Sequence, residues 1–182
     1  MSKSKQSRGK LVRKFGENIF GNVKFDRLLN RKPYGPGQHG QTRRRKPSNY
    51  SVQLRERQKI KFMYGLLEKQ FRNTFEKAEK LKGETGTNML QLLERRLDNI
   101  VYRLCFAPTR PAARQLVSHK HFLVNGKPVN IPSYLVKPGD IIEVKEKSKK
   151  MDIVLDAMRR IKGDIDLPWL ELDKAKMRGA FI

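Results

Sequence analysis

The sequence predicts an α+β protein that is mostly helical and carries one small antiparallel sheet. Apolar residues recur every three or four positions in residues 51–82 and again in 92–117, which is the period of an amphipathic helix. After residue 120 the pattern changes to alternation and runs into Asn125-Gly126, a strong signal for a two-residue hairpin. A basic, extended N-terminal arm precedes these elements.

Positive charge dominates the composition and is concentrated near the N-terminus. The 182 residues include 41 Lys or Arg against 18 Asp or Glu, a formal net charge of +23. Residues 1–61 hold 18 of the basic and 3 of the acidic residues, so they carry +15 and the remainder carries +8. A merely solvated surface would mix the two signs, so we expect a polyanionic partner. The start of the arm has little periodicity, and residues 7–10 should be extended or disordered until they find that partner.

A glycine- and proline-rich loop, Pro33 to Gly40, leads into the basic run Arg43 to Lys46. Its glycines match the spacing G-x-G-x-x-G of dinucleotide-binding folds. However, no apolar strand precedes them, and an arginine run stands where a helix should follow. We therefore expect a loop whose backbone approaches phosphates closely, with Tyr34 and His39 available to stack or to hydrogen-bond.

Residues 51–82 should be helical, with a kink or break at Gly65. Basic side chains crowd the N-terminal half of this segment. Its aromatic residues should belong to the core and not to a base-stacking platform, because their spacing is helical. The packed face consists of Ile60, Tyr64, Leu67, Phe71, Phe75 and Ala78.

The next helix should begin near Asn88, a favourable N-cap, and continue to Leu104. Its carboxylates Glu94 and Asp98 lie one turn apart. Because they are so close to several arginines, we expect them to orient those arginines; an ion-paired carboxylate is a poor general base. The polar face of this helix carries Arg96, Asn99 and Arg103.

A second short helix should follow, with Thr109 as its cap and Pro111 in its first turn, where a missing N–H costs little. Small and aliphatic residues form its packing side. Lys120 comes directly after it. The side opposite the packing residues carries Arg110, Arg114 and Ser118.

The hairpin at Asn125-Gly126 should join a strand near residues 121–124 to a short or edge strand that contains Pro128. Residues 134–136 and 141–144 should close the sheet around a turn at 137–140. Residues 151–161 outline one more amphipathic helix. The tail from Pro168 should be irregular and pack on the first helical region.

Catalysis, a metal site and a membrane span find no support in the sequence. The three histidines, His39, His119 and His121, have no partners that suggest a catalytic grouping. His119 and His121 with Cys105 would lack a fourth metal ligand, and their cationic neighbourhood repels a cation. The single Cys105 cannot form an intrachain disulfide and fits a reducing cytosol. No apolar run approaches the roughly 18 residues that a membrane span needs.

Several stretches resemble known RNA-binding proteins. ERRLDNIVYRL, TRPAARQLVSHKHFLVNGKPVNIPSY and KPGDIIEV are similar to the small RNA-binding module named after small-subunit ribosomal protein four. That module also occurs in some RNA-modifying enzymes and in a tRNA synthetase. GENIFG, PGQHG, VQLRERQKIKFMYGLLEKQFRN and PWLELD extend the resemblance to nearly the whole chain and favour the bacterial ribosomal protein family itself.

The resemblance implies a particular domain organisation. Residues 1–50 would be the basic arm and loop, extended on RNA. Residues 51–88 plus 150–182 would form a helical rRNA-binding domain that is discontinuous in sequence, with the module inserted at 89–149. Some relatives carry an N-terminal zinc-binding cysteine cluster that is absent here. Family members usually continue past the segment matching 174–181, whereas this sequence ends at Ile182.

The resemblance also implies a function and partners. The protein would be a structural constituent of the cytoplasmic small ribosomal subunit, without enzymatic activity or cofactors. It would bind small-subunit rRNA early in assembly, at a multi-helix junction of the 5′ domain. Ribosomal protein five, protein three and messenger RNA at the messenger entrance would be further partners, and the family influences decoding accuracy. Neither a membrane nor a homo-oligomer is implied.

The residues that we expect to contact RNA are basic side chains of the arm and helices, with a few polar neighbours. They are Lys10, Arg13, Lys14, Tyr34, Gln38, His39, Arg43, Arg44, Arg45, Lys46, Arg55, Arg57, Lys59, Lys61, Arg72, Arg96, Arg103, Arg110, Arg114, Gln115, Ser118, His119, Lys120 and Asn125. Two alternatives stay open. An RNA-modifying enzyme would need a catalytic domain outside the module, and a general RNA chaperone would bind any duplex with similar affinity.

Overall fold

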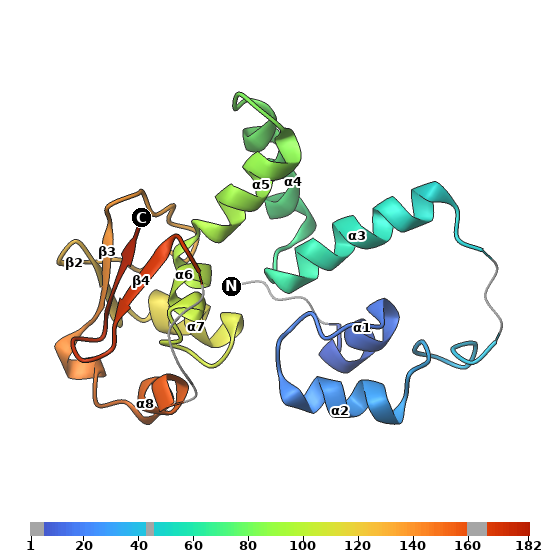
Figure 1. Cartoon of the computed structure of the whole chain (residues 1–182), viewed down its shortest axis with the longest axis horizontal. Coiled ribbons are helices and arrows are strands. Elements are labelled where there is room, and N and C mark those ends of the chain that lie inside the picture. Colours follow the sequence, from blue (N-terminus) through green and yellow to red (C-terminus); the bar gives the residue numbers. More distant parts are fainter. Residues whose placement is uncertain (1–5, 43–45, 160–166) are drawn as a thin grey trace. The chain divides into compact units, whose positions relative to one another are not determined.

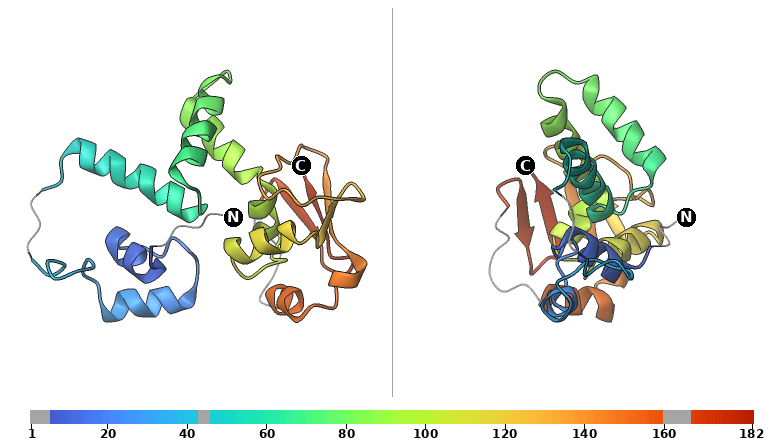
Figure 2. Two further views of the ribbon diagram at one scale, coloured as in Figure 1. Left: turned by 180° about the vertical axis from the view of Figure 1, so that it is seen from behind. Right: turned by 90° about the vertical axis from the view of Figure 1, so that its right-hand side faces the viewer.

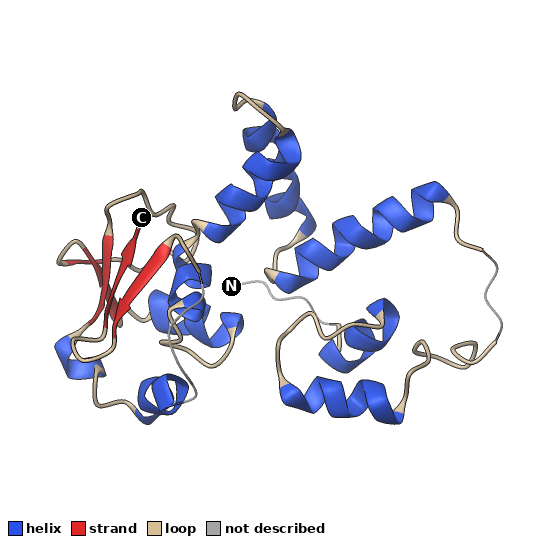
Figure 3. Cartoon of the chain, viewed as in Figure 1, coloured by secondary structure: helices blue, strands red, loops and turns tan. Residues whose placement is uncertain are grey.

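The computed structural model describes residues 6–42, 46–159 and 167–182 (Figure 1). The chain forms two compact units: an N-terminal unit, residues 1–73, and a C-terminal unit, residues 74–182. The described residues form eight α-helices and a five-stranded antiparallel sheet, so the predicted α+β class is confirmed (Figure 3).

The N-terminal unit is helical and has its own small core. Phe15 and Phe62 pack with ring centroids 6.1 Å apart, and Leu11 and Ile19 join the same cluster. Its helices are α1 (Arg8–Phe15), α2 (Val23–Arg31), α3 (Asn49–Met63) and the first half of α4 (Glu68–Glu79).

The basic arm that we expected to be extended contains the helices α1 and α2. A short apolar stripe, Leu11, Val12 and Phe15, is buried on α1, and this burial favours the helix over an extended chain. At the start of α2 the side chain of Asn22 accepts a hydrogen bond from the Lys24 amide, which caps the helix. The prediction gave weight to the charge and overlooked these short signals.

The break predicted at Gly65 is confirmed. Gly65 has a left-handed backbone (φ 64°) between α3 and α4. Its amide donates to the carbonyl of Phe62, and the amide of Leu66 donates to the carbonyl of Lys61. This pair of bonds is the Schellman arrangement, which ends a helix at a left-handed residue.

In the C-terminal unit, the single helix predicted from Asn88 to Leu104 is wrong. The segment forms two helices, α5 (Thr85–Glu94) and α6 (Leu97–Arg103), because Arg96 is extended (ψ 135°) and pairs with Leu135. Asn88 is not an N-cap either. Its side-chain amide donates to the carbonyls of Leu81 and Lys82, in the turn that follows α4.

The second short helix is confirmed as α7 (Arg110–Ser118). The hydroxyl of Thr109 accepts a hydrogen bond from the Ala112 amide, and Pro111 lies in the first turn, as predicted. A helix also forms near the predicted 151–161, as α8 (Asp152–Arg159), preceded by the 3-10 turn η1 (Glu146–Ser148).

The sheet has the strand order β2-β1-β3-β5-β4. Asn125 and Gly126 are both left-handed (φ 49° and 77°), as a tight hairpin between β1 and β2 requires. Pro128 lies in the edge strand β2, which confirms the prediction. The strands are β1 (Phe122–Val124), β2 (Lys127–Pro128), β3 (Ile141–Val144), β4 (Leu170–Asp173) and β5 (Arg178–Phe181).

The prediction of an irregular tail from Pro168 is wrong, because this segment forms the strands β4 and β5. Strand β5 pairs with β3, with Ile141 opposite Ala180. Along β5 burial alternates, with Gly179 and Phe181 buried, so the tail satisfies the period of a strand. Residues 167–182 therefore extend the sheet of the module within the C-terminal unit.

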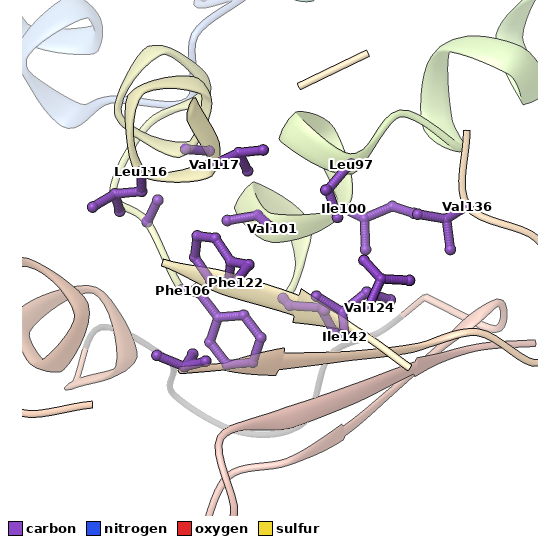
Figure 4. Packing of buried hydrophobic residues seen from close by; sticks show 14 of the residues in the cluster. Leu97, Ile100, Val101, Phe106, Leu116, Val117, Phe122, Val124, Val136 and Ile142 are labelled. Carbon is purple, nitrogen blue, oxygen red and sulfur yellow. The ribbon is translucent and has the colours of Figure 1, made fainter. Parts of the chain in front are cut away.

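Helices α6 and α7 lie on one side of this sheet, as the two opposite views agree (Figures 1 and 2). Side chains from both helices and from the sheet meet in one buried cluster (Figure 4). The cluster includes Leu97, Ile100 and Val101 of α6, Leu116 and Val117 of α7, and Phe122, Val124 and Ile142 of the sheet. This core fixes the two helices and everything that their polar sides carry.

Candidate nucleic-acid interface

Four arginines on the polar sides of α6 and α7 are held by carboxylate and amide side chains. We call this set, Arg96, Arg103, Arg110 and Arg114 together with Glu94, Asp98 and Asn99, the arginine network. The side chains of Arg96, Arg103 and Arg114 are partly exposed, whereas Asp98 and Asn99 are only 3% and 1% exposed. The two most buried members of the network, Asp98 and Asn99, therefore accept hydrogen bonds from arginines that are more exposed.

Asp98 holds two arginines at once. Its carboxylate accepts from Nε and Nη2 of Arg96 at 3.1 and 3.0 Å, and from Nε and Nη2 of Arg114 at 2.8 and 2.7 Å. Arg96 precedes the first turn of α6, whereas Arg114 lies in α7. One buried carboxylate thus fixes guanidinium groups from both helices.

Glu94 and Asn99 hold the other two arginines. Glu94 accepts from Nε and Nη2 of Arg103 at 3.1 and 2.7 Å, and from the amide nitrogen of Asn99 at 2.8 Å. The amide oxygen of Asn99 accepts from Nε of Arg110 at 2.8 Å. Arg110 also lies 4.5 Å from the ring centroid of Tyr102, a cation–π contact. The expectation that Glu94 and Asp98 orient the arginines is confirmed.

At the end of α7 the predicted residues Gln115, His119 and Lys120 are exposed. Ser118 is half-buried, and its hydroxyl donates to the carbonyl of Arg114 at 2.8 Å. Lys120 has a left-handed backbone (φ 63°) directly after the helix.

The neighbouring His121 faces inward and pairs with Ser148, with Nδ1 and Oγ 2.9 Å apart. Burial lowers the pKa of His121, and the nearby His119 and Lys145 lower it further. Cys105, at the end of α6, is half-buried, and burial raises the pKa of its thiol.

Asn125 has a structural task in the hairpin. Its amide nitrogen donates to Asp140 at 2.8 Å, and its amide oxygen accepts from the Ile141 backbone amide at 2.9 Å. These bonds join the β1–β2 turn to the start of β3. An RNA contact by this side chain stays a prediction.

In the N-terminal unit, Arg13 organises the loop at residues 33–40. Its guanidinium donates to the carbonyls of Tyr34 and Gly35 at 3.0 and 2.8 Å, and lies 4.8 Å from the Tyr34 ring centroid. One face of Tyr34 is therefore covered by an arginine. Gln38 and His39 are exposed at the tip of the loop. Lys46 is exposed, and the predicted Arg43, Arg44 and Arg45 lie outside the described residues.

The basic residues of α3 make contacts within the unit. Arg55 donates to the carbonyl of Phe15, which satisfies the C-terminal end of α1. Lys59 pairs with Glu17, and this hydrogen bond raises the pKa of Lys59. Arg57 and Lys61 both pair with Glu68.

The hydrogen bond from Lys61, with the charges of Lys61 and Arg57, lowers the pKa of Glu68. Nothing in the sequence marked Glu17 or Glu68 as a partner, because the pairs depend on the packing of α1, α3 and α4. Lys14 donates to the side chain of Gln58 at 2.9 Å, while Lys10 and Arg72 are exposed.

Sequence reasoning missed a basic stripe on α2. Lys24, Arg27 and Arg31 recur at spacings of three and four and are all exposed. That spacing was a usable signal, but we expected the segment to be extended. Arg8, also overlooked, lies on α1 with its guanidinium 5.6 Å from the Phe20 ring centroid.

In the described parts of the chain, no group of three His, Cys, Asp or Glu side chains is placed to hold a metal ion. No helix within the same residues combines the length and apolar character needed to cross a membrane.

Comparison with known proteins matches both halves of the chain. The family profile "Ribosomal protein S4/S9 N-terminal domain" matches residues 3–94, and "S4 domain" matches residues 95–142. A small ribosomal subunit protein uS4 of Parabacteroides distasonis is 57% identical over 175 residues, 96% of this chain and 85% of the relative. The uS4 of Chlorobium luteolum is 51% identical over 183 residues, 100% of this chain and 89% of the relative. That of Chlorobaculum tepidum is 50% identical over 182 residues, with the same two shares.

The two profiles follow each other along the chain, and the relatives match nearly all of it, so the resemblance suggested by separate stretches is confirmed. A module shared only with RNA-modifying enzymes would have matched the second segment alone. The chain therefore belongs to the uS4 family, the structural and non-enzymatic proteins of the small ribosomal subunit.

Proposed function

We propose that the protein binds small-subunit rRNA where several RNA helices converge in the 5′ domain, and holds that junction early in assembly. The observation that carries the proposal is the arginine network, above all the buried Asp98 that fixes Arg96 and Arg114. Arginines held in one orientation lose little further side-chain freedom when they bind phosphates. The network is thus suited to a rigid, specific phosphate arrangement.

Recognition should be mainly of RNA shape. The major groove of A-form RNA is too deep and narrow for side chains to read, so proteins contact phosphates and 2′-hydroxyls. Guanidinium groups fixed on two packed helices present donors at set separations. Such a surface favours the phosphate positions of one folded RNA over those of an ordinary duplex.

The remaining positive charge should supply general attraction. The exposed residues Lys10, Lys46 and Arg72, with the stripe Lys24, Arg27 and Arg31 on α2, lie outside the arginine network. Neutralising phosphates with such residues releases counterions and makes binding salt-dependent. We propose that these residues supply general affinity for RNA, and that the arginine network supplies selectivity for one folded RNA.

The other roles of the proposal rest on family membership and not on the geometry. They are contacts with ribosomal proteins five and three, a place near the messenger entrance, an influence on decoding accuracy, and a cytoplasmic location. The relatives are small ribosomal subunit proteins, which supports the assembly context.

A titration tests the proposal. The protein is titrated against the 5′ portion of small-subunit rRNA and against a random-sequence duplex of equal length, at several salt concentrations. We expect the rRNA to bind about a thousandfold tighter and to keep its affinity at physiological salt. Arg114→Ala should weaken rRNA binding by about 1 to 3 kcal/mol. Equal affinities that both collapse with salt would refute the proposal and favour a general RNA chaperone.

A further inference from the structure

Asp98 places a negative charge inside a surface that is proposed to meet a polyanion. It is 3% exposed and accepts hydrogen bonds from Arg96 and Arg114. Simple electrostatics would select against a carboxylate here, because it lowers the attraction to every phosphate. Its presence therefore calls for a second effect that outweighs this loss.

Stability is a weak explanation. Taking a carboxylate and two guanidinium groups out of water is costly, and packed apolar side chains often stabilise a fold as well as a buried ion pair does. The buried apolar cluster beneath α6 and α7 already joins these helices to the sheet.

Orientation explains the arrangement better. Each arginine offers Asp98 its Nε and Nη2 together, so both guanidinium planes are fixed relative to one carboxylate. Since Arg96 comes from the start of α6 and Arg114 from α7, Asp98 also sets the separation of their charges.

We infer that Asp98 is a positioning residue that gives the interface its selectivity: it weakens general attraction to RNA and strengthens binding to one folded RNA. The inference rests on the proposed function and deepens it. It predicts that removing the charge of Asp98 changes the binding affinity in opposite directions for an arbitrary duplex and for the 5′ rRNA. Removing the charge should help, or leave unchanged, the binding of an arbitrary duplex, and should harm the binding of the 5′ rRNA.

The test compares two variants with the same change in charge. Asp98→Asn keeps the size of the side chain and raises the net charge by one. Asp156→Asn does the same on α8, where Asp156 is exposed and 3.3 Å from Arg159. Both variants should bind a random duplex at least as well as the wild type. Only Asp98→Asn should lose affinity for the 5′ rRNA, by about tenfold to a hundredfold.

Arg114→Lys decides the matter if Asp98→Asn fails to fold, which circular dichroism reports. Lysine keeps the charge but cannot make the two-nitrogen contact with Asp98. We expect lower affinity for the 5′ rRNA with an unchanged salt dependence. The inference is overturned if a folded Asp98→Asn binds that rRNA as tightly as Asp156→Asn, or if Arg114→Lys keeps wild-type selectivity. A wild-type protein that binds both RNAs alike would instead refute the proposed function, and this inference with it.

Discussion

Lys120 and Cys105 occupy equivalent positions at the ends of two consecutive helices. Each follows its helix with a left-handed backbone, φ 63° for Lys120 and 57° for Cys105. Both helices end in the paired hydrogen bonds of a Schellman motif. In the shorter bond of each pair, the Lys120 amide donates to the Val117 carbonyl and the Cys105 amide donates to the Tyr102 carbonyl. Glycine fills this position after α3, as Gly65. Helices α6 and α7 thus place side chains where the backbone disfavours them.

Lys120→Gly should therefore stabilise the fold while weakening RNA binding. Glycine adopts the left-handed conformation without steric cost, so we expect the free energy of unfolding to rise by about 0.5 to 1 kcal/mol. Loss of an exposed ammonium at the proposed interface should weaken rRNA binding by about 1 to 2 kcal/mol. Denaturant unfolding and an rRNA titration measure the two effects.

Cys105→Gly is the matched control, because it makes the same backbone change at the end of α6. It should leave rRNA affinity unchanged, and its gain in stability should be smaller, because the half-buried Cys105 side chain loses its packing. If it weakened binding as much as Lys120→Gly does, the loss would come from altered helix ends and not from the missing ammonium.

Gly40→Ala should disrupt the loop at residues 33–40. A Cβ atom on Gly40 would lie 2.0 Å from the carbonyl oxygen of Gly35, and backbone atoms cannot move aside as a side chain can. We expect a loss of about 1 to 3 kcal/mol in unfolding free energy. Faster hydrogen exchange of the Gly40 amide, which donates to the Gly37 carbonyl, would locate the damage.

Gly86→Ala is the control for this steric effect. Gly86 lies in α5 and nothing approaches its missing Cβ within 4 Å. Alanine should be neutral there or stabilise by up to about 1 kcal/mol. Equal losses in both variants would contradict the close approach of Gly40 to Gly35.

Features set by neighbouring residues were predictable from the sequence. The break at Gly65, the cap at Thr109 and the hairpin at Asn125-Gly126 each depend on a few adjacent residues. The division between α5 and α6 was not predictable, because the apolar period continues through it. It arises where Arg96 pairs with Leu135, a contact across 39 positions of the chain.

The arginine network was predictable only where its members are close in sequence. Glu94, Asp98 and the arginines of α6 lie within one or two turns, so their mutual orientation could be expected. That Asp98 also holds Arg114, and Asn99 holds Arg110, depends on how α7 packs beside α6. The strands of the tail were missed because β5 pairs with β3, whose residues lie about 35 to 39 positions earlier in the chain, and β4 in turn pairs with β5.

His121 should make stability depend on pH. Its folded-state pKa is lowered from the ordinary 6.5 by burial, so between these two values the unfolded chain binds more protons. The stabilisation is therefore present above pH 6.5 and is lost as pH falls through the folded pKa. Denaturant unfolding between pH 7.5 and 5 should show this decline.

His121→Asn should flatten that decline, since asparagine can still hydrogen-bond Ser148 and does not titrate. His39→Asn, at an exposed position, is the control and should keep the wild-type slope. An unchanged slope in His121→Asn would assign the pH dependence to other groups.

Cys105 should react slowly with alkylating reagents. Burial raises the pKa of its thiol, and the charge of Lys174 opposes this only in part, so the reactive thiolate is scarce near pH 8. Iodoacetamide should modify the folded protein more slowly than it modifies a short cysteine peptide. The difference should vanish in denaturant, and equal rates in the folded state would contradict the burial.

Substitutions of Gly179 and Leu104 should partly compensate each other in their effect on the free energy of unfolding. A Cβ on Gly179 of β5 would lie 2.5 Å from both terminal methyl carbons of Leu104, which is fully buried at the end of α6. Gly179→Ala should therefore cost about 1 to 3 kcal/mol through overpacking. Leu104→Ala should cost about 2 to 5 kcal/mol through the cavity that it leaves.

The double variant separates direct contact from independent damage. If β5 packs on α6, the methyl group that Gly179→Ala adds enters the space vacated at Leu104, and the combined loss is smaller than the sum of the single losses by about 0.5 kcal/mol or more. Leu104→Ala with Gly86→Ala, whose added Cβ meets no atom within 4 Å, should be additive. Strict additivity in the first pair would mean that the added methyl group does not enter the space left by Leu104 and would contradict the close approach of Gly179 to that side chain.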